Sequence, residues 1–260
     1  MGFDSSIEWT QDTWNPWHGC KKVSEGCKFC YMYRDKERYG HDPTTVLRSK
    51  TSFNDPLKKE EGRLIFTCSW SDWFIEDADE WRPEAWEIIR KTPQHTYQIL
   101  TKRPERILEC LPEDWGDGYE NVWLGVSVES GKQMHRVKIL KDIPAKVKFI
   151  SAEPLIAPLI DLYMPFDERL DFHHYDNFID WVIIGGESGN ETGKYRYREC
   201  ELKWIRDILD WCRHNEIPAF VKQLGTHLAT QLSCRDRHGK MLRDFPEDIR
   251  VRQFPEAYKL

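Results

Sequence analysis

The chain has 260 residues, 40% of them hydrophobic, and a formal net charge of -6. That length and apolar content support one large domain or at most two. The acidic balance excludes a protein that binds polyanions through its overall charge. The charge is uneven, however, because residues 20–59 carry ten Lys or Arg against five Asp or Glu, and residues 131–148 carry six against one. Such segments are typical of solvated helix faces, and they also suit a phosphate-bearing substrate.

No segment predicts a secretory signal or a membrane span. Residues 1–12 are polar, and no run approaches the ~20 apolar residues that a spanning helix needs. We therefore expect a cytoplasmic protein with no membrane partner, in a compartment where thiols stay reduced. Five of the eight cysteines are scattered within apolar patterns and are interpreted as small core residues: Cys68, Cys110, Cys200, Cys212 and Cys234.

Short runs rich in β-branched and aromatic residues recur along the chain and predict strands. In chain order they are residues 5–10, 63–70, 96–104, 121–130, 146–155, 180–189 and 218–225. Several are almost continuously hydrophobic, as are parallel strands that are buried on both faces. Helix-like segments separate them at residues 77–93, 104–112, 129–144 and 198–218.

The alternation of strand and helix predicts an α/β fold with a parallel sheet and right-handed crossovers. No dinucleotide-binding glycine pattern follows the first strand, so a partial or full TIM-like (β/α) barrel is favoured over a Rossmann sheet. Residues 1–225 are expected to form this barrel. Residues 159–180 are aromatic and acidic and predict an inserted loop or lid, and residues 226–260 predict a C-terminal appendage packed on the barrel.

Each apolar run turns polar at its C-terminal end, where barrels place their chemistry. The polar clusters are Ser69-Trp70-Ser71-Asp72, Thr101-Lys102-Arg103, Ser127-Val128-Glu129, Ser151-Ala152-Glu153-Pro154, Gly185-Gly186-Glu187-Ser188 and Lys222-Gln223. Six such transitions in register predict a common polar mouth above an apolar floor. The glycine pair either lets backbone N–H groups approach a ligand or serves a tight turn. Each charged member either contacts a ligand or belongs to a structural ion pair.

Three cysteines, Cys20, Cys27 and Cys30, lie within the segment GCKKVSEGCKFCYMY at residues 19–33. Three interpretations compete: a structural zinc site with His18 as an unusually spaced fourth ligand, three unrelated thiols, or an iron–sulfur cluster with three thiolates and one open iron. If a helix over residues 26–39 begins near Cys27, then Cys27 and Cys30 lie on one helical face. Cys20 would then close the site from the loop.

The segment WTQDTWNPWHGCKKVSEGCKFCYMYRDKERYG resembles the opening of the phage Gp37/Gp68-like family. FTCSWSDWF, LTKRPER, LGVSVE, SAEPL, GGESG and FVKQLG resemble later blocks of that family in the same order, over roughly residues 7–225. That family is itself similar to radical SAM enzymes, which share a partial or full β/α barrel. Their cluster motif, C-x3-C-x-aromatic-C, follows the first strand.

The chain departs from the radical SAM pattern in two places. Cys27-Lys28-Phe29-Cys30 matches the second half of the cluster motif, but six residues rather than three separate Cys20 from Cys27. No Gly-Gly-Glu follows the second strand, where radical SAM proteins commonly hold the methionyl amine. Ser69, Ser71 and Asp72 are the polar residues available there instead.

The resemblance implies that the three cysteines bind a [4Fe–4S] cluster whose open iron holds S-adenosylmethionine. An electron from an external donor would then cleave S-adenosylmethionine to a 5′-deoxyadenosyl radical that abstracts hydrogen from a substrate. The implied cofactor contacts are Phe29, Ser69, Ser71, Asp72, Thr101, Lys102, Arg103, Ser127, Glu129, Gly185 and Gly186. The implied catalytic or substrate-binding residues are Glu153, Glu187 and Lys222.

A phage-type origin favours a nucleic-acid or nucleotide substrate in the host cytoplasm. One such reaction is the isomerisation or rearrangement of a hypermodified thymine base of phage DNA. Two other classes stay open: a zinc protein whose barrel mouth binds nucleic acid, and an iron–sulfur electron carrier or sensor that does not cleave S-adenosylmethionine. Trp14 and Trp17 are expected to shield the cluster, whereas the other tryptophans singled out, Trp81, Trp86, Trp204 and Trp211, are expected to pack within helices.

Overall fold

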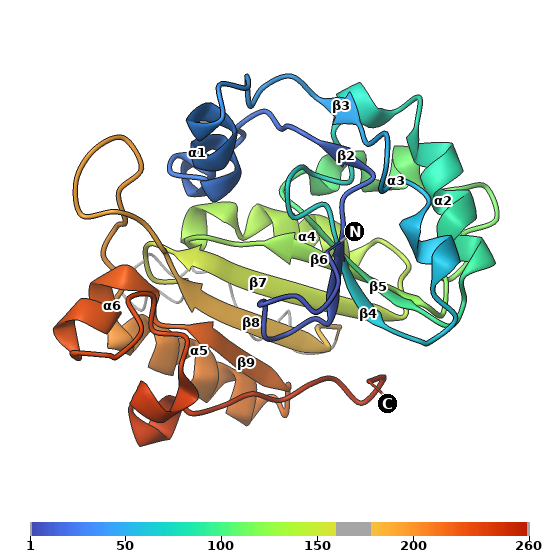
Figure 1. Ribbon diagram of the computed structural model, residues 1–260. Helices are drawn as coiled ribbons and strands as arrows, with labels where there is room; N and C mark the ends of the chain where they lie inside the picture. The colour runs from blue at the N-terminus through green and yellow to red at the C-terminus, as the bar shows by residue number, and fades with distance from the viewer. Residues whose placement is uncertain (1, 160–177, 259–260) are drawn as a thin grey trace.

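A computed structural model describes residues 2–159 and 178–258 (Figure 1). Seven parallel strands form one sheet in the order β1-β4-β5-β6-β7-β8-β9. Their bounds are β1 (Asp12–Trp14), β4 (Leu64–Thr67), β5 (Thr96–Thr101), β6 (Val122–Ser127), β7 (Val147–Leu155), β8 (Trp181–Gly186) and β9 (Ala219–Gln223). The sheet is curled, and its edge strands β1 and β9 do not pair with each other. The chain is therefore a mixed α/β protein built on a half-barrel of seven parallel strands, as a partial TIM-like barrel would be.

The predicted strands after the first all overlap strands of this sheet, but the first prediction is wrong. Residues 5–10 form bends and a turn, and the strand begins only at Asp12. The Thr10 backbone N–H closes a turn on the carbonyl oxygen of Ile7 at 3.2 Å. The Thr10 hydroxyl donates to the carbonyl oxygen of Leu64 at 3.1 Å. Thr10 therefore links the turn to the first residue of β4 and is not itself part of a strand.

Six α-helices occur in the described residues, with a small antiparallel ribbon of β2 (Trp17–His18) and β3 (Leu47–Arg48). The helices are α1 (Tyr31–Arg38), α2 (Arg82–Lys91), α3 (Ile107–Cys110), α4 (His135–Lys141), α5 (Leu202–His214) and α6 (Gly225–Gln231). Short 3-10 helices lie at Glu25–Cys27, Asp55–Lys58, Glu76–Ala78, Pro104–Arg106, Gly131–Gln133, Leu242–Asp244 and Glu247–Ile249. The four helix-like segments predicted between the strands contain α2, α3, α4 and α5. Helix α6 lies in the segment for which no helix was predicted.

Helix α5 shows why these segments pack on the outer face of the sheet. Ile205, Ile208, Leu209 and Cys212 are buried on one side of the helix, at the spacing that gives a single apolar stripe. They join the main core together with outward-facing strand residues such as Val182. Burying each large apolar side chain is worth about 1.5–3 kcal/mol, which outweighs the weak helix propensity of a 13-residue segment.

The inner face of the half-barrel has an aromatic floor that both ends of the described chain cover. Its strand residues include Phe66, Trp123, Phe149, Trp181 and Phe220, with Trp9, Ile7, Phe254 and Tyr258 packed against them. The Trp181 and Phe254 rings stack with centroids 5.5 Å apart. The segment that carries Phe254 runs beside β9, where Phe220 and Arg252 form an antiparallel bridge (Figure 1). The division of domains at residue 225 stays a prediction.

Along β7 the same inner face changes from aromatic to polar toward the carboxyl end. Phe149, Ser151 and Glu153 are alternate residues, and alternate residues of a strand share a face. On β6, the neighbours of Phe149 and Ser151 in the ladder are Gly125 and Ser127, and Trp123 precedes them on the same face. The polar side chains at the strand ends therefore lie above the aromatic floor.

Two further expectations from the sequence concern the insertion and membrane-spanning helices. Residues 160–177, most of the predicted insertion, lie outside the described residues. Within residues 2–159 and 178–258, no helix is long and apolar enough to cross a bilayer.

Candidate functional site: the cysteine loop over the strand ends

The three clustered cysteines lie in the connection from β1 to α1. Because β1 is parallel to β4, this connection leaves the sheet at its carboxyl edge. Cys27 ends the short 3-10 helix Glu25–Cys27, and α1 begins only at Tyr31. Cys30 precedes that helix with a ψ of 130°, so the prediction that Cys27 and Cys30 share one helical face is wrong. They are instead joined by a turn in which Cys30 N–H donates to the Cys27 carbonyl oxygen at 3.4 Å.

The ends of β4 and β5 bind the first part of this loop. After β4, the Trp70 carbonyl oxygen accepts from Gly19 N–H at 3.0 Å, and the Ser71 hydroxyl donates to the Gly19 carbonyl oxygen at 2.6 Å. After β5, Arg103 Nη2 donates to the Lys21 carbonyl oxygen at 2.6 Å, and its Nη1 lies 3.7 Å from Cys20 Sγ. Ser71 and Arg103, both predicted cofactor contacts, therefore position the loop.

Glu129, after β6, holds the middle of the loop. Its carboxylate accepts from the Ser24 hydroxyl at 2.8 Å and from Arg136 Nη1 at 3.0 Å, and it is fully buried. Lys102 Nζ lies 3.8 Å from the same carboxylate. The loop approaches so closely that a Cβ at Gly26 would lie 2.3 Å from the Glu129 side chain. Glu129 is thus a buried anchor with charge partners on two elements.

Glu187, after β8, reaches the same loop through Arg198. Arg198 donates from Nε and Nη2 to the two carboxylate oxygens of Glu187 at 2.8 and 2.5 Å. Its Nη1 donates to the Glu25 carbonyl oxygen at 2.8 Å. Phe29 lies beside this guanidinium, with 5.2 Å between the Arg198 carbon and the ring centroid. Glu187 therefore belongs to a bidentate ion pair rather than standing free for proton transfer.

Both carboxylate oxygens of Asp72, which follows β4, accept hydrogen bonds from residues at the end of β5. Oδ1 accepts from the Thr101 hydroxyl at 2.7 Å and from Phe74 N–H at 3.0 Å. Oδ2 accepts from Lys102 N–H at 2.9 Å, and Arg103 Nη1 lies 3.2 Å from it. Asp72 and Thr101 were both predicted to contact the cofactor, and both side chains are engaged with the protein itself.

Glu153 and Lys222 face each other across β8. Lys222 Nζ lies 2.5 Å from Glu153 Oε1, and both side chains are partly exposed. Gly185 lies between them, where an added Cβ would come within 3.1 Å of the Glu153 carboxyl carbon. A Cβ at Gly186 would lie only 2.1 Å from the carbonyl oxygen of Leu224. Close packing therefore accounts for the glycine pair, and the Glu153–Lys222 pair is not tied to the cysteine loop.

Two further predicted cofactor contacts, Ser69 and Ser127, hydrogen-bond within the protein. The Ser69 hydroxyl accepts from Asn15 Nδ2 at 3.0 Å. Ser127 is buried, and its carbonyl oxygen accepts from Arg136 Nη1 at 2.8 Å. Sequence reasoning missed Arg136 and Arg198 because each pairs with a strand-end carboxylate from a separate segment. Only the basic character of residues 131–148 gave a signal for Arg136.

A further tryptophan, besides the two predicted, lines the cysteine loop. Trp14 and Trp17 are fully buried in the main core around Trp73, with ring centroids 5.8 and 5.1 Å from it, and Cys20 packs against that core, so their role as cluster shields stays a prediction. Trp70 packs with the small apolar cluster to which Cys30 also belongs. The run TCSWSDWF contained this residue but offered no way to tell which of its tryptophans faces the loop.

Met32, Tyr33 and Tyr195 form the buried centre of that cluster, with Cys20, Cys30 and Trp70 packed around it. The Tyr33 hydroxyl also donates to the Cys20 carbonyl oxygen at 2.6 Å. The scattered cysteines lie elsewhere. Cys68, Cys200 and Cys212 are buried in the main core and Cys110 and Cys234 pack at its margin, as interpreted from the sequence.

All three loop cysteines are free thiols in an electrostatically coupled group. Burial raises the pKa of Cys20 to about 12, with Asp72 adding to the rise and Arg103 opposing it. Burial also raises the pKa of Cys30, against the lowering by the backbone N–H groups of Tyr33 and Met32 and, more weakly, by Lys102. Cys27 adds to the rise in both pKa values, so it interacts electrostatically with Cys20 and with Cys30.

Three thiols at the carboxyl edge of the sheet suit a metal cluster, but they do not lie close enough together to bind one. Among the described residues, no three His, Cys, Asp or Glu side chains are close enough together to hold a metal ion. His18, the fourth ligand of the zinc interpretation, has its Nδ1 at 2.6 Å from Lys36 Nζ. Ligation by all three thiols therefore requires the loop at residues 19–30 to draw them together.

Comparison with known proteins gives one match that covers most of the chain. A family model described as a protein of unknown function (DUF5131) matches residues 4–248. No curated protein and no solved structure matches the chain. The chain belongs to the DUF5131 family.

Proposed function

We propose that the protein is a radical SAM-like enzyme in which Cys20, Cys27 and Cys30 bind a [4Fe–4S] cluster. The observation that carries the proposal is that three free thiols lie in one loop at the carboxyl edge of a parallel half-barrel, anchored from four strand ends. The carboxyl edge is where β/α barrels carry their chemistry. The resemblance to the phage Gp37/Gp68-like family and to radical SAM enzymes supports the same assignment.

Two nearby cations favour the thiolate form of the loop cysteines, against the burial that disfavours it. Cluster ligation requires deprotonated sulfur, and burial works against it at Cys20 and Cys30 by raising their pKa values. Arg103 and Lys102 lower the pKa values of Cys20 and Cys30 respectively, so both cations favour the thiolate. Two cations from the end of β5 would thus offset part of the negative charge that three thiolates bring to the loop.

A [4Fe–4S] cluster held by Cys20, Cys27 and Cys30 would supply the electron that cleaves S-adenosylmethionine, and an external donor would provide that electron. The protein's own residues have separate tasks. Tyr33 and Trp70 pack in the same cluster as Cys20 and Cys30 and would limit the access of water to that side. Asp72, Glu129 and Glu187 position the loop. Glu153 and Lys222 form the charged pair that is left to bind substrate or move a proton at the mouth of the half-barrel.

The substrate class follows from charge and from the resemblance. The cysteine loop lies within residues 20–59, the segment with ten basic against five acidic residues. We propose a nucleic-acid or nucleotide substrate, with rearrangement of a hypermodified thymine base in phage DNA as the specific reaction to test. That reaction would place the protein in the host cytoplasm.

Iron content tests the ligand assignment. Protein reconstituted anaerobically with iron and sulfide should bind about four iron atoms per chain and absorb visible light. Cys20→Ser, Cys27→Ser and Cys30→Ser should each lose most of the iron and absorbance while keeping the far-ultraviolet circular dichroism of the folded chain. Cys234→Ser is the matched control, because Cys234 packs at the core margin away from the loop.

Two outcomes would contradict the assignment. Full iron content in any of the three loop variants would remove that cysteine from the ligand set. A colourless protein that binds one zinc ion per chain in place of iron would favour the structural zinc site instead.

A further inference from the structure

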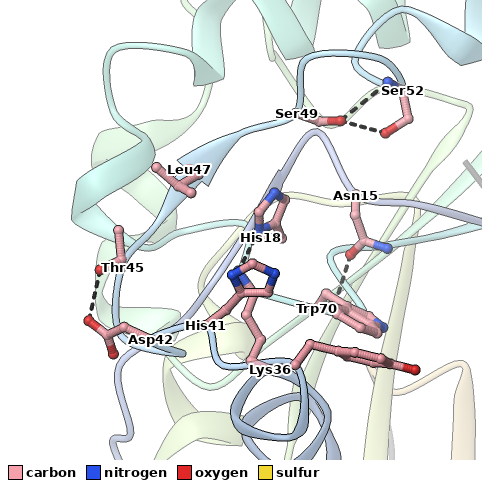
Figure 2. Close-up of a pocket in the computed structure, with 11 residues that line it drawn as sticks. Asn15, His18, Lys36, His41, Asp42, Thr45, Leu47, Ser49, Ser52 and Trp70 are labelled. Carbon is pink, nitrogen blue, oxygen red and sulfur yellow. Dashed lines mark hydrogen bonds between the residues drawn. The ribbon is translucent and has the colours of Figure 1, made fainter.

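A cavity of about 480 Å³ lies beside the cysteine loop but outside it. It is bounded by α1, by the β2–β3 ribbon and by the segment after β4 (Figure 2). Lys36, His18, Leu47 and Trp70 are among the residues that line it, and none of the three clustered cysteines does. The cavity is large enough for a small organic molecule, and ligand sites generally combine an apolar wall with a few polar groups.

Lys36 is the unusual member of this lining. Its residue is only 5% exposed, and its Nζ hydrogen-bonds to His18 Nδ1 at 2.6 Å (Figure 2). Asp42 raises the pKa of Lys36 but does not reach ion-pair distance, and Lys36 has no ion pair within residues 2–159 and 178–258. A buried ammonium without a counter-ion is costly. Burial lowers the pKa of Lys36 accordingly, and an anion in the cavity would remove the cost.

The wall of the cavity offers aromatic surface next to this cation. Trp70 lines the cavity, and its backbone N–H donates to Asn15 Oδ1 at 2.7 Å, which fixes the backbone there (Figure 2). Tyr39, beyond the end of α1, adds a second ring to the lining. An aromatic ring lends stacking energy to any planar base, whatever its sequence.

The cavity lining carries basic side chains and a single acidic one. Asp42 is the acidic residue of the lining, and its carboxylate already accepts from the backbone N–H of Thr44 and from the Thr44 and Thr45 hydroxyls. His41 also lines the cavity. The surrounding segment, residues 20–59, has an excess of five basic residues over acidic ones.

We propose that this cavity binds a nucleotide, with the phosphate group on Lys36 and the base against Trp70. Lysine is a common point-charge partner of phosphate. The assignment does not depend on an iron–sulfur cluster, because the cavity contains none of the three cysteines.

Binding measured by isothermal titration calorimetry on the full chain tests the proposal. The probes are the four deoxynucleoside 5′-monophosphates, the matching nucleosides without phosphate, and inorganic phosphate. At least one monophosphate should bind, and its nucleoside should bind roughly tenfold more weakly or worse, since a hydrogen bond to a charged group is lost. Equal binding of nucleotide and nucleoside, or no binding of any monophosphate, would overturn the proposal without any variant.

Two variants test the phosphate-binding half and the base-binding half of the site separately. Lys36→Met keeps the length and apolar stem of the side chain and should weaken nucleotide binding at least about tenfold. Lys58→Met is the control, because Lys58 is exposed and lies outside the cavity. Trp70→Leu should weaken binding of the nucleotide but leave that of inorganic phosphate unchanged. Unaltered nucleotide affinity in folded Lys36→Met or Trp70→Leu would refute that half of the site.

The phosphate can come from a free nucleotide or from a nucleic-acid strand. A single-stranded oligonucleotide that binds more tightly than the monophosphates, with the same dependence on Lys36, would assign the site to a strand. Weaker binding of the oligonucleotide would assign it to a free nucleotide. Cys27→Ser should bind both probes as the unaltered chain does, because Cys27 neither lines the cavity nor packs with Trp70. A failure of the cluster assignment is thus distinguishable from a failure of the nucleotide site.

Discussion

Asp72→Asn tests whether the residues at the strand ends act on a ligand or on the fold. The substitution keeps the shape of the side chain but removes its charge. Asp72 is only 4% exposed, and its two oxygens receive donors from Thr101, Phe74, Lys102 and Arg103. An amide can accept on one oxygen only, so at least one pair of donors then faces an NH2 group.

The size of the effect follows from the burial of the pair. Arg103 is 7% exposed, so solvent screens its attraction to Asp72 little. Removing one partner of a buried ion pair costs about 3–5 kcal/mol, because the other charge stays buried without compensation. The lost hydrogen bonds are part of the same cost and are not added to it. A typical domain has only about 5–15 kcal/mol of stability, so the variant should unfold far more easily.

Urea denaturation followed by circular dichroism measures this difference. The midpoint for Asp72→Asn should fall strongly at an unchanged slope, because the surface exposed on unfolding stays the same. Asp77→Asn is the control: Asp77 pairs with Lys21 at the surface, where such pairs contribute about 0–1 kcal/mol. A loss below about 1 kcal/mol for Asp72→Asn would refute the positioning role and return Asp72 to the candidate cofactor contacts.

Three further predictions concern packing, pH and thiol reactivity. Gly186→Ala should cost more stability than Gly185→Ala in urea denaturation, since its Cβ would lie 2.1 Å from a backbone carbonyl oxygen whereas that of Gly185 would lie 3.1 Å from a side chain; equal losses would contradict the packing account. Burial lowers the pKa of His95 below 6.5, so the unfolded chain binds the extra proton first and stability should fall as pH drops below 6.5. The loss should reach at most about 1.4 kcal/mol per pH unit and be smaller in His95→Gln, and an identical pH profile in that variant would exclude His95 as a cause. In the metal-free chain at pH 8, iodoacetamide should modify Cys20 at least about a hundredfold more slowly than in urea, because its pKa rises from 9.0 to about 12; equal rates measured by peptide mass spectrometry would show an open thiol.

The sequence predicted the architecture because hydrophobic runs and their polar ends are local signals. Strands such as β8 (Trp181–Gly186) are buried along their whole length, and a segment with helical periodicity follows it at residues 198–218. The first strand was misplaced because the aromatic residues before it, including Trp9, cover the floor of the half-barrel from a turn rather than a ladder. Burial of an aromatic side chain therefore does not reveal which backbone conformation carries it.

The sequence predicted which strand ends carry polar residues, but not what those residues contact. Residues after β4, β5, β6 and β8 anchor the cysteine loop, whereas the Glu153–Lys222 pair lies apart from it. Whether Glu187 is free or paired depends on Arg198, which reaches it from a separate loop. The same holds for Glu129 and Arg136. The cavity at Lys36 had no sequence signal beyond the basic character of residues 20–59, because a missing counter-ion is visible only in three dimensions.

Reductive cleavage of S-adenosylmethionine is the most direct test of the proposed function. Anaerobically reconstituted protein would be mixed with S-adenosylmethionine and dithionite, with and without phage DNA that carries a hypermodified thymine base, and assayed for 5′-deoxyadenosine by liquid chromatography. The proposal predicts 5′-deoxyadenosine from the unaltered chain and none from Cys30→Ser. An iron-loaded protein that forms none under either condition would contradict radical SAM chemistry and favour an iron–sulfur carrier or sensor.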